Sequence, residues 1–155
     1  MNSLIDILAR LGIIKKKAIF SQKKVVLLNK IRKAGFPEKE VVVSVDEFFD
    51  GNEDIGSIGC NIFPDPPSLG DFYEILKKIE LAEKTKTLAI RIADVDDADW
   101  FYTDAVYVIG DYNKREINQL FEPLKPDEVY EGLMYGSPAN FPGTNNGKSY
   151  SIWWD

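Results

Sequence analysis

The stretch Thr87-Leu88-Ala89-Ile90-Arg91-Ile92-Ala93 carries the strongest β-strand signal in the chain. Leu88, Ile90 and Ile92 recur at every second position, so in an extended chain they share one face while Arg91 points to the other. Strict alternation of this kind is typical of a strand with one buried face. We therefore expect a strand here, packed through its three apolar residues.

The segments on either side of this strand supply the other expected elements. Ser44 and Glu47 have the spacing of a capping box, which predicts a short helical turn over residues 46–50. Pro126 is followed by two acidic residues, the order that opens a short helix. Asp71 is either the N-cap of a longer helix or an acid of its first turn. Apolar periodicity predicts helices over residues 71–84 and 113–121, and strands over residues 41–45, 57–63, 105–109 and 150–154.

The order of these elements indicates an α+β fold. From Ser57 onward it reads strand, helix, strand, strand, helix, strand, which matches the βαββαβ order of a ferredoxin-like unit. The strand over residues 41–45 can be added at an edge of that sheet. Many unrelated activities use this fold, so it indicates no function by itself.

The formal net charge of −6 over 155 residues hides two parts of opposite sign. Residues 1–36 hold nine Lys and Arg residues against Asp6 alone, a net charge of +8. Residues 37–155 hold the other ten basic residues and 24 acidic ones, a net charge of −14. This division is typical of a basic arm that binds nucleic acid or membrane, and equally of two structural parts that attract each other. We expect one domain overall, made of a basic helical segment (1–36) and an acidic α+β part (37–155).

The pattern within the basic segment favours a helical hairpin packed on the acidic part, with its lysines in solvent. The first apolar stretch carries charges and its lysines follow it, an order that fits neither a secretory signal nor a membrane span. No aromatic residues interleave with the lysines of residues 21–34 to stack on bases, so neither a nucleic acid nor a membrane is assigned as a partner. A second helix is expected between Ser21 and Gly35. The apolar positions of the two helices are Leu4, Ile7, Leu8 and Leu11, then Val25, Leu27, Leu28 and Ile31.

Missing residue types exclude several classes of enzyme. The chain has no histidine, which removes Ser-His-Asp and Cys-His catalysis and the commonest zinc ligand. A single cysteine, Cys60, excludes an intrachain disulfide and any multi-cysteine metal site. Because Cys60 lies in the apolar stretch 57–63, we expect a buried, inert thiol rather than a nucleophile. Neither a dinucleotide fingerprint nor a P-loop is present, and no cofactor is expected.

Four aspartates lie within six residues, from Asp94 to Asp99. An EF-hand loop that began at Asp94 would need Gly where Asp99 stands and Glu where Ala105 stands, so that motif fails. Three interpretations stay open: a dispersed magnesium site, a solvated turn, and a surface that contacts a basic partner. Trp100 follows at once and is either an interface anchor or a ring packed against the sheet. The four aspartates are Asp94, Asp96, Asp97 and Asp99.

A second acidic patch runs from Asp46 to Asp54. Helix capping and turn formation explain Asp46 and Asp50. The paired carboxylates of glycosidases need a set separation across a cleft, which spacing along a sequence does not show. We therefore assign no catalytic residue and no metal ligand, and binding is favoured over catalysis. The candidate partner-binding residues are Glu53, Asp54, Asp94, Asp96, Asp97, Asp99 and Trp100.

Three stretches carry a resemblance to a known family: residues 43–52 with 57–61, Pro126–Gly132 with Gly136 and Pro138, and the terminal Trp153-Trp154-Asp155. Together they resemble small acidic bacterial immunity proteins, which accompany polymorphic or contact-dependent toxins. The resemblance covers roughly residues 41–155 and assigns no functional residue. It implies a cytoplasmic, non-enzymatic protein that binds and neutralises a cognate toxin, often a nuclease with a positive substrate groove. An acidic inhibitor suits such a groove because it presents charges like those of phosphate.

Two other functions stay open at this point. One is a small hydrolase, or a magnesium-dependent enzyme, that uses Asp and Glu side chains. The other is a regulatory module anchored through the basic helices of residues 1–36. Binding of Mg²⁺ would favour the metal-dependent enzyme, and binding of residues 1–36 to anionic vesicles or DNA would favour the anchored module.

Overall fold

The computed structural model of the chain describes residues 11–12, 22–96, 99–141 and 147–155. Its centre is a five-stranded antiparallel sheet, and a separate two-stranded hairpin, β3 (Asp94–Val95) with β4 (Phe101–Tyr102), connects two of its strands. The mixture of helices and a sheet confirms the α+β class. In spatial order the sheet consists of β1 (Val42–Val43), β2 (Thr85–Arg91), β5 (Ala105–Gly110), β7 (Lys148–Trp153) and β6 (Glu128–Glu131).

The strand predicted from the alternating leucine and isoleucines is confirmed as β2. Leu88 and Ile90 are buried in the main core, opposite Val108 and Val106 of β5. Ala89 is also buried, but on the opposite face of the sheet. Both faces of β2 are therefore covered, whereas the alternation predicted only one buried face.

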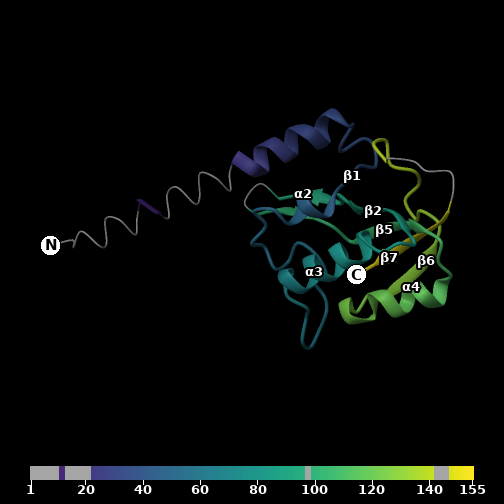
Figure 1. Cartoon of the computed structure of the whole chain (residues 1–155). Helices are drawn as coiled ribbons and strands as arrows, with labels where there is room; N and C mark the ends of the chain where they lie inside the picture. The colour runs from purple at the N-terminus through teal and green to yellow at the C-terminus, as the bar shows by residue number, and fades with distance from the viewer. Residues whose placement is uncertain (1–10, 13–21, 97–98, 142–146) are drawn as a thin grey trace.

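Helices cover one face of the sheet, where the main hydrophobic core lies. Figure 1 shows α3 and α4 on the same side of the strands. Within the described ranges, no helix has both the length and the apolar content needed to cross a membrane. This layer consists of α2 (Val45–Phe49), α3 (Leu69–Glu80), α4 (Lys114–Phe121) and the short 3-10 helix η1 (Glu122–Leu124).

Helices α2, α3 and α4 each begin with a capping box, so local sequence sets where they start. The predicted pair of Ser44 and Glu47 is confirmed, with both of its hydrogen bonds at 3.1 Å. At α3 the N-cap is Ser68, and Asp71 is the first-turn acid that completes the box. The second of the two readings of Asp71 is therefore correct.

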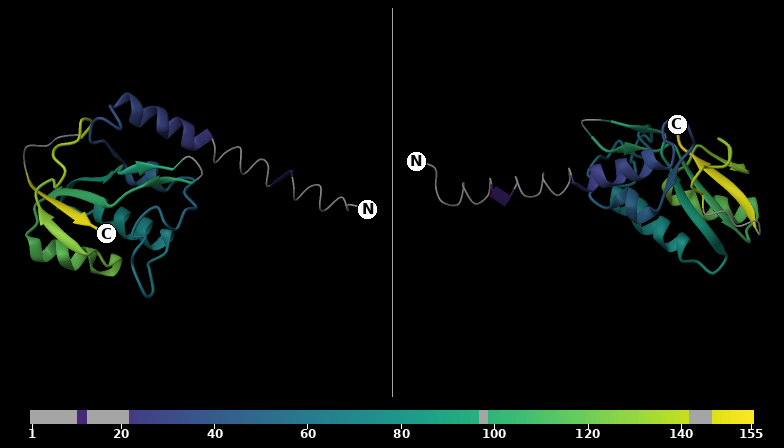
Figure 2. Two further views of the ribbon diagram at one scale, coloured as in Figure 1. Left: turned by 180° about the vertical axis from the view of Figure 1, so that it is seen from behind. Right: turned by 90° about the horizontal axis from the view of Figure 1, so that it is seen from above.

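A further helix over residues 22–33, here called the basic helix, packs on the acidic part of the chain. Leu27 and Ile31 are buried in the same core as the sheet residues. Val25 was expected to face inward but is 52% exposed. Figures 1 and 2 show the basic helix along the outside of the sheet and its helices. Of the first predicted helix, only Leu11 and Gly12 lie within the described residues.

A strap, residues 132–141, crosses the face of the sheet opposite the helices. At one end the backbone N–H of Gly132 donates to the carbonyl of Ser149 in β7 (2.8 Å). At the other end the Asn140 side chain pairs with β1: Val42 N–H donates to Asn140 Oδ1 (2.9 Å) and Asn140 Nδ2 donates to the Val42 carbonyl (2.7 Å). Asn140 thereby satisfies the outer edge of β1 without a further strand.

Two expectations about residues 57–63 are wrong. The segment forms turns with a single bridge, between Ile58 and Thr103, instead of a strand. Gly59 turns the chain there with φ of +60°. Cys60 is consequently exposed, 3.7 Å from the Tyr102 hydroxyl, and is not the buried thiol that an apolar strand would hold. The ferredoxin-like order needs a strand over 57–63 and is not confirmed.

The short helix expected after Pro126 is also absent from the described structure, which has β6 there. Asp127 N–H donates to the carbonyl of Trp153 (2.9 Å), and Val129 lies opposite Ile152 of β7. Pairing with a distant strand therefore overrides the local helix signal, as is common where strand pairing buries apolar side chains.

The two C-terminal tryptophans differ in burial, which predicts a difference in stability. Trp154 is 1% exposed, and its indole N–H donates to the carbonyl of Leu124 (2.8 Å), whereas Trp153 is half-buried under the strap. Trp154→Phe should lower the free energy of unfolding by about 2–3 kcal/mol, because it removes buried volume and leaves that carbonyl unpaired. Trp153→Phe, the matched control, should cost about 1 kcal/mol. Urea unfolding of both variants measures the difference, and equal costs would contradict it.

Candidate functional site

Trp100 lies in the core and holds the β3–β4 hairpin against α2. It is 1% exposed, and its indole N–H donates to the carbonyl of Phe48 (2.7 Å). Its ring packs edge-to-face with Phe101, with 5.2 Å between the ring centroids. The prediction that Trp100 contacts a partner directly is therefore wrong, because its side chain has almost no surface exposed to solvent. Trp100 instead fixes the position of the acidic residues beside it.

The structure places residues 51–57, which carry Glu53 and Asp54 of the second acidic patch, beside the hairpin that carries the first cluster. Gly51, with φ of +86°, lies against the ring of Trp100. Further along the same loop, Ser57 accepts a hydrogen bond from the backbone N–H of Thr103 (2.9 Å). Residues 51–57 therefore run beside β4. Five carboxylates on this loop and the hairpin, here called the acidic surface, are Glu53, Asp54, Asp94, Asp96 and Asp99.

Four of these five residues are exposed, whereas Asp54 is half-buried. The Asp54 carboxylate accepts a hydrogen bond from the backbone N–H of Gly56 (2.8 Å), so it also stabilises its own turn. Asp94 accepts one from the N–H of Val95 (2.8 Å) within the hairpin. Asp97, the remaining predicted residue, lies outside the described residues. The acidic surface consequently presents negative charge to solvent on a backbone held by the core.

An apolar residue that the sequence analysis missed stands within this loop. Ile55 is 85% exposed, between Asp54 and Gly56. Further along the loop, Phe63 is 92% exposed. Large apolar side chains surrounded by polar residues are typical of the anchors of protein interfaces. The available signal was an isolated isoleucine in a turn-forming stretch, where no core-facing periodicity accounts for it.

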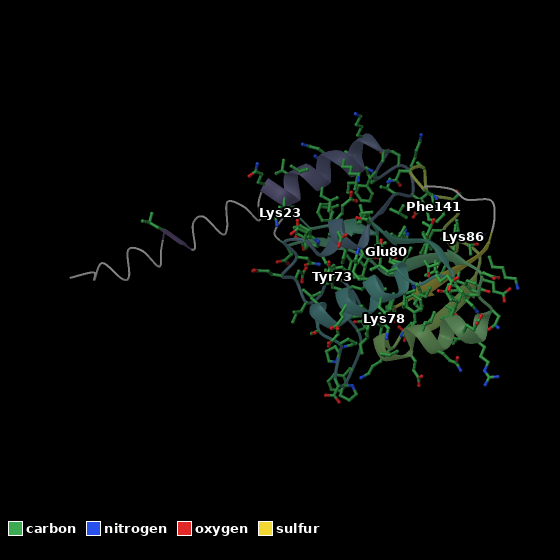
Figure 3. The ribbon with its side chains drawn as sticks, viewed as in Figure 1. Lys23, Tyr73, Lys78, Glu80, Lys86 and Phe141 are labelled. Atoms are coloured by element: carbon green, nitrogen blue, oxygen red, sulfur yellow. The ribbon has the colours of Figure 1, made fainter. Side chains whose placement is uncertain are left out.

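The acids of the second patch, on and beside α2, are held by lysines of the basic helix. Lys23 pairs with Asp50, and Lys30 pairs with Glu47. Figure 3 shows Lys23 at the start of the basic helix, next to the ribbon of α2. The sequence left two explanations for the charge division. Among the described residues, these ion pairs support the second one, in which the basic and acidic parts of the chain attract each other.

On its other side α2 is joined to α3 through Asp46. The Asp46 carboxylate accepts hydrogen bonds from Lys77 (3.0 Å) and from the Tyr73 hydroxyl (2.9 Å). The contact with Lys77, followed by that with Tyr73, holds the pKa of Asp46 below its ordinary value. Glu80 and then Asp46 raise the pKa of Lys77, so this lysine stays charged. The pair is structural, because both of its charges are occupied within the chain.

The most buried ionic network lies beneath the strap, around Arg91. Its guanidinium binds Glu40 through two hydrogen bonds (2.7 and 3.0 Å) and Asp104 through a third (2.8 Å). The ring of Tyr135 in the strap lies 3.7 Å from the guanidinium carbon, and its hydroxyl donates to Asp104 (2.7 Å). Burial opposes the positive charge of Arg91, but the two carboxylates outweigh it and raise its pKa. The network locks the strap to the sheet.

This network offers no pair of free carboxylates for hydrolysis. Glu40 and Asp104 both bind the guanidinium of Arg91, so their carboxylates are occupied within the network. Tyr107 is buried nearby, and burial raises the pKa of its phenol, so it stays protonated. In the part of the chain that the structure describes, no three His, Cys, Asp or Glu side chains converge as a metal site would require.

Comparison with known proteins gives one family and one relative. A family model described as the uncharacterized protein YfbO family matches residues 21–153. A protein of Escherichia coli (strain K12) named "Uncharacterized protein YfbO" is 28% identical over 116 residues, which is 74% of this chain and 82% of that protein. No solved structure matches the chain.

The lowered pKa of Asp46 predicts a pH-dependent contribution to stability. Because the folded pKa lies below the ordinary value of 3.8, the charged carboxylate stabilises the fold above about pH 4. That contribution disappears as the pH falls through the folded pKa. Asp46→Asn should therefore lower the midpoint of urea unfolding at pH 7 but not at about pH 2. Glu83→Gln, at an exposed site, is the control, and an equal shift at both pH values would contradict the prediction.

The Arg91 network predicts a large cost when its cation is removed. Arg91→Met should lower the free energy of unfolding by about 3 kcal/mol, because it leaves the half-buried carboxylates of Glu40 and Asp104 without a counter-charge. Lys84→Met breaks the more exposed pair of Lys84 with Glu116 and should change stability little. Urea unfolding at pH 7 compares the two variants. Equal effects would show that the network under the strap is not a stabilising element.

Proposed function

This chain belongs to the YfbO family, and we propose that it is a non-enzymatic protein that neutralises a toxin by binding a basic region of it through the acidic surface. The observation that supports the proposal is the placement of residues 51–57 beside the buried ring of Trp100 and beside β4. Four exposed carboxylates, and the half-buried Asp54, thereby lie on one loop and the hairpin next to it.

The negative charge of this surface and an exposed apolar side chain within it both support binding here. Clustered negative charge speeds the encounter with a positive partner, and its effect is greatest at low salt. Ile55 adds the apolar side chain that charged residues alone do not supply, since binding energy concentrates in a few apolar or aromatic anchors. A support fixed by Trp100 reduces the ordering cost on binding.

The identity of the partner as a toxin rests on the resemblance of residues 41–155 to immunity proteins. A nuclease with a positive substrate groove is the partner that the charge of the acidic surface fits best, because the carboxylates would occupy the positions of phosphates. Inhibition of this kind requires no catalytic group. We place the encounter in the cytoplasm, where a toxin of this type would act.

The other two functions receive less support from the described residues. Lys23 and Lys30 pair with acids of the same chain, and Lys24 donates to the carbonyl of Asp96, so these lysines are engaged within the fold rather than directed to a membrane or nucleic acid. The most buried carboxylates of the Arg91 network are occupied as well. No observation favours a second function.

A protection experiment tests the proposed function. The protein is expressed in cells that also produce the product of a neighbouring gene as the candidate toxin, and the two proteins are tested for direct binding. Survival of the cells together with a complex of nanomolar Kd would support the proposal. Cell death at full expression of both proteins would reject the toxin as partner.

The acidic surface predicts which carboxylates set the association rate. Asp94→Asn, Asp96→Asn and Asp99→Asn together should slow association with the basic partner about tenfold at low salt, with a smaller effect as salt is added. Asparagine keeps an oxygen that can accept the turn hydrogen bonds, so the hairpin should persist. Stopped-flow measurements give the association rate at low salt and at higher salt.

A control with the same change of charge is available on η1 and β6. Glu122→Gln, Glu128→Gln and Glu131→Gln together also remove three negative charges, all from exposed residues. This variant should associate nearly as fast as the unchanged protein. If both variants slow association equally, net charge rather than the acidic surface governs the encounter.

A further inference from the structure

The shortness of β1 leaves part of the outer edge of β2 uncovered. β1 pairs only through Val42 opposite Arg91 and Val43 opposite Ile90. At Ser44 the chain leaves the sheet, because the capping box starts α2 there. From Leu88 back toward the start of β2, no strand lies beside this edge in the described structure.

The backbone groups of Leu88 point to this uncovered edge. Ile92 N–H donates to the carbonyl of Val41 (3.0 Å), so the peptide groups of Ile92 are directed to the β1 side. The direction of the backbone N–H and carbonyl groups alternates along a strand, so those of Ile90 and Leu88 also point to the β1 side. Ile90 is opposite Val43, but Leu88 has no counterpart in β1. Among the described residues, no hydrogen bond reaches the N–H or carbonyl of Leu88 from this side.

Leu88 is also 95% buried, since its relative exposure is only 5%. Peptide groups of buried residues are almost always paired, because an unmade hydrogen bond away from bulk water is unfavourable. Strand edges left open in this way are the usual sites at which an extended chain is added to a sheet. The chemical complement of one N–H and one carbonyl on a strand edge is the main chain of another strand.

A groove lies along this edge. It has a volume of about 670 Å³. Its rim carries Lys30, Lys86, Glu47 and Glu80, two charges of each sign, so its net field does not select a charged ligand. Figure 3 shows Glu80 on α3 and Lys86 at the start of β2. The residues nearest the edge itself are Val43, Ser44, Thr87, Leu88, Ala89 and Asn140.

We propose that this groove binds an extended, uncharged peptide segment of another protein, which joins the sheet as a strand beside β2 in continuation of β1. Its main chain pairs with the N–H and carbonyl of Leu88. Its side chains alternate between the helix-covered face, beside Val43, and the face of the strap, beside Ala89. Both neighbours are apolar, so β-branched residues such as valine and threonine suit the segment.

A single chain segment fits this edge better than a second copy of the protein. The groove is flanked by Ser44 at the start of α2, by Asn140 of the strap and by Lys30 of the basic helix. In a symmetric pair of copies, the same three elements of one copy would face those of the other across the shared edge, whereas a single segment meets them once. The proposal concerns a different surface from the acidic one and does not rest on the toxin-binding function.

The test uses the full chain and the peptide acetyl-Thr-Val-Thr-Val-Thr-amide as probe. Two further peptides are N-methylated, one at the second residue only and one at both the second and the third residue. Adjacent residues direct their N–H groups to opposite edges of a strand, so the first peptide keeps one edge that can pair with β2 and the second keeps none. The singly methylated peptide should bind within about threefold of the probe and the doubly methylated one at least tenfold more weakly, which makes the first the matched control of the second.

Amide NMR and hydrogen exchange on the labelled protein locate the binding. The probe should slow exchange of the Leu88 amide at least tenfold at saturation and shift the signals of Val43, Ser44 and the Asn140 side chain. Equal binding of the two methylated peptides, or no change at Leu88 with millimolar probe, would overturn the proposal. Protection of Leu88 that grows with protein concentration alone would assign the edge to a second copy and would also overturn it.

Discussion

The reciprocal hydrogen bonds of Ser44 and Glu47 are the interaction on which the other features of this molecule depend. They end β1 after two residues and start α2 at once. Because β1 ends there, the edge of β2 at Leu88 stays uncovered. Because α2 starts there, the carbonyl of Phe48 reaches the indole of Trp100, and the acids of α2 face lysines on both sides. One local capping motif therefore positions two different surfaces.

The division of charge along the sequence acquires a physical meaning in the fold. Lysines of the basic helix pair with acids on and beside α2, so much of the second acidic patch is neutralised within the chain. The acids of the β3–β4 hairpin and Glu53 remain exposed to solvent, as do other acids of the described residues. The formal net charge of −6 therefore does not show where the negative charge faces solvent.

Elements with a strong local signal were predictable from the sequence, and those that depend on distant pairing were not. The alternation of Leu88 and Ile90, and the capping residues of α2, act over a few neighbours, so they were found. The segment around Cys60 has strand-like composition, but a glycine at positive φ turns it. The residues of β6 carry a helix-start signal, yet pairing with β7 decides their state.

The acidic side chains of the candidate site were identified from sequence, but Trp100 was given the wrong role. A tryptophan beside aspartates looks the same in sequence whether its ring is exposed or buried. Its burial depends on the Phe48 carbonyl, which lies 52 residues away in the chain. Ile55 was missed because an exposed isoleucine in a turn is not part of any periodic apolar pattern in the sequence.

The sequence by itself determined the α+β class, the starts of the helices, the absence of histidine chemistry and the opposite charges of the two parts. These follow from residue types and from interactions within a few positions. Only the tertiary structure decided that residues 51–57 lie beside the acidic hairpin, that Arg91 locks the strap, and that one edge of β2 is uncovered by the described residues. Each of these depends on contacts between residues far apart in the chain, and their pairing is set by how the sheet and its helices pack.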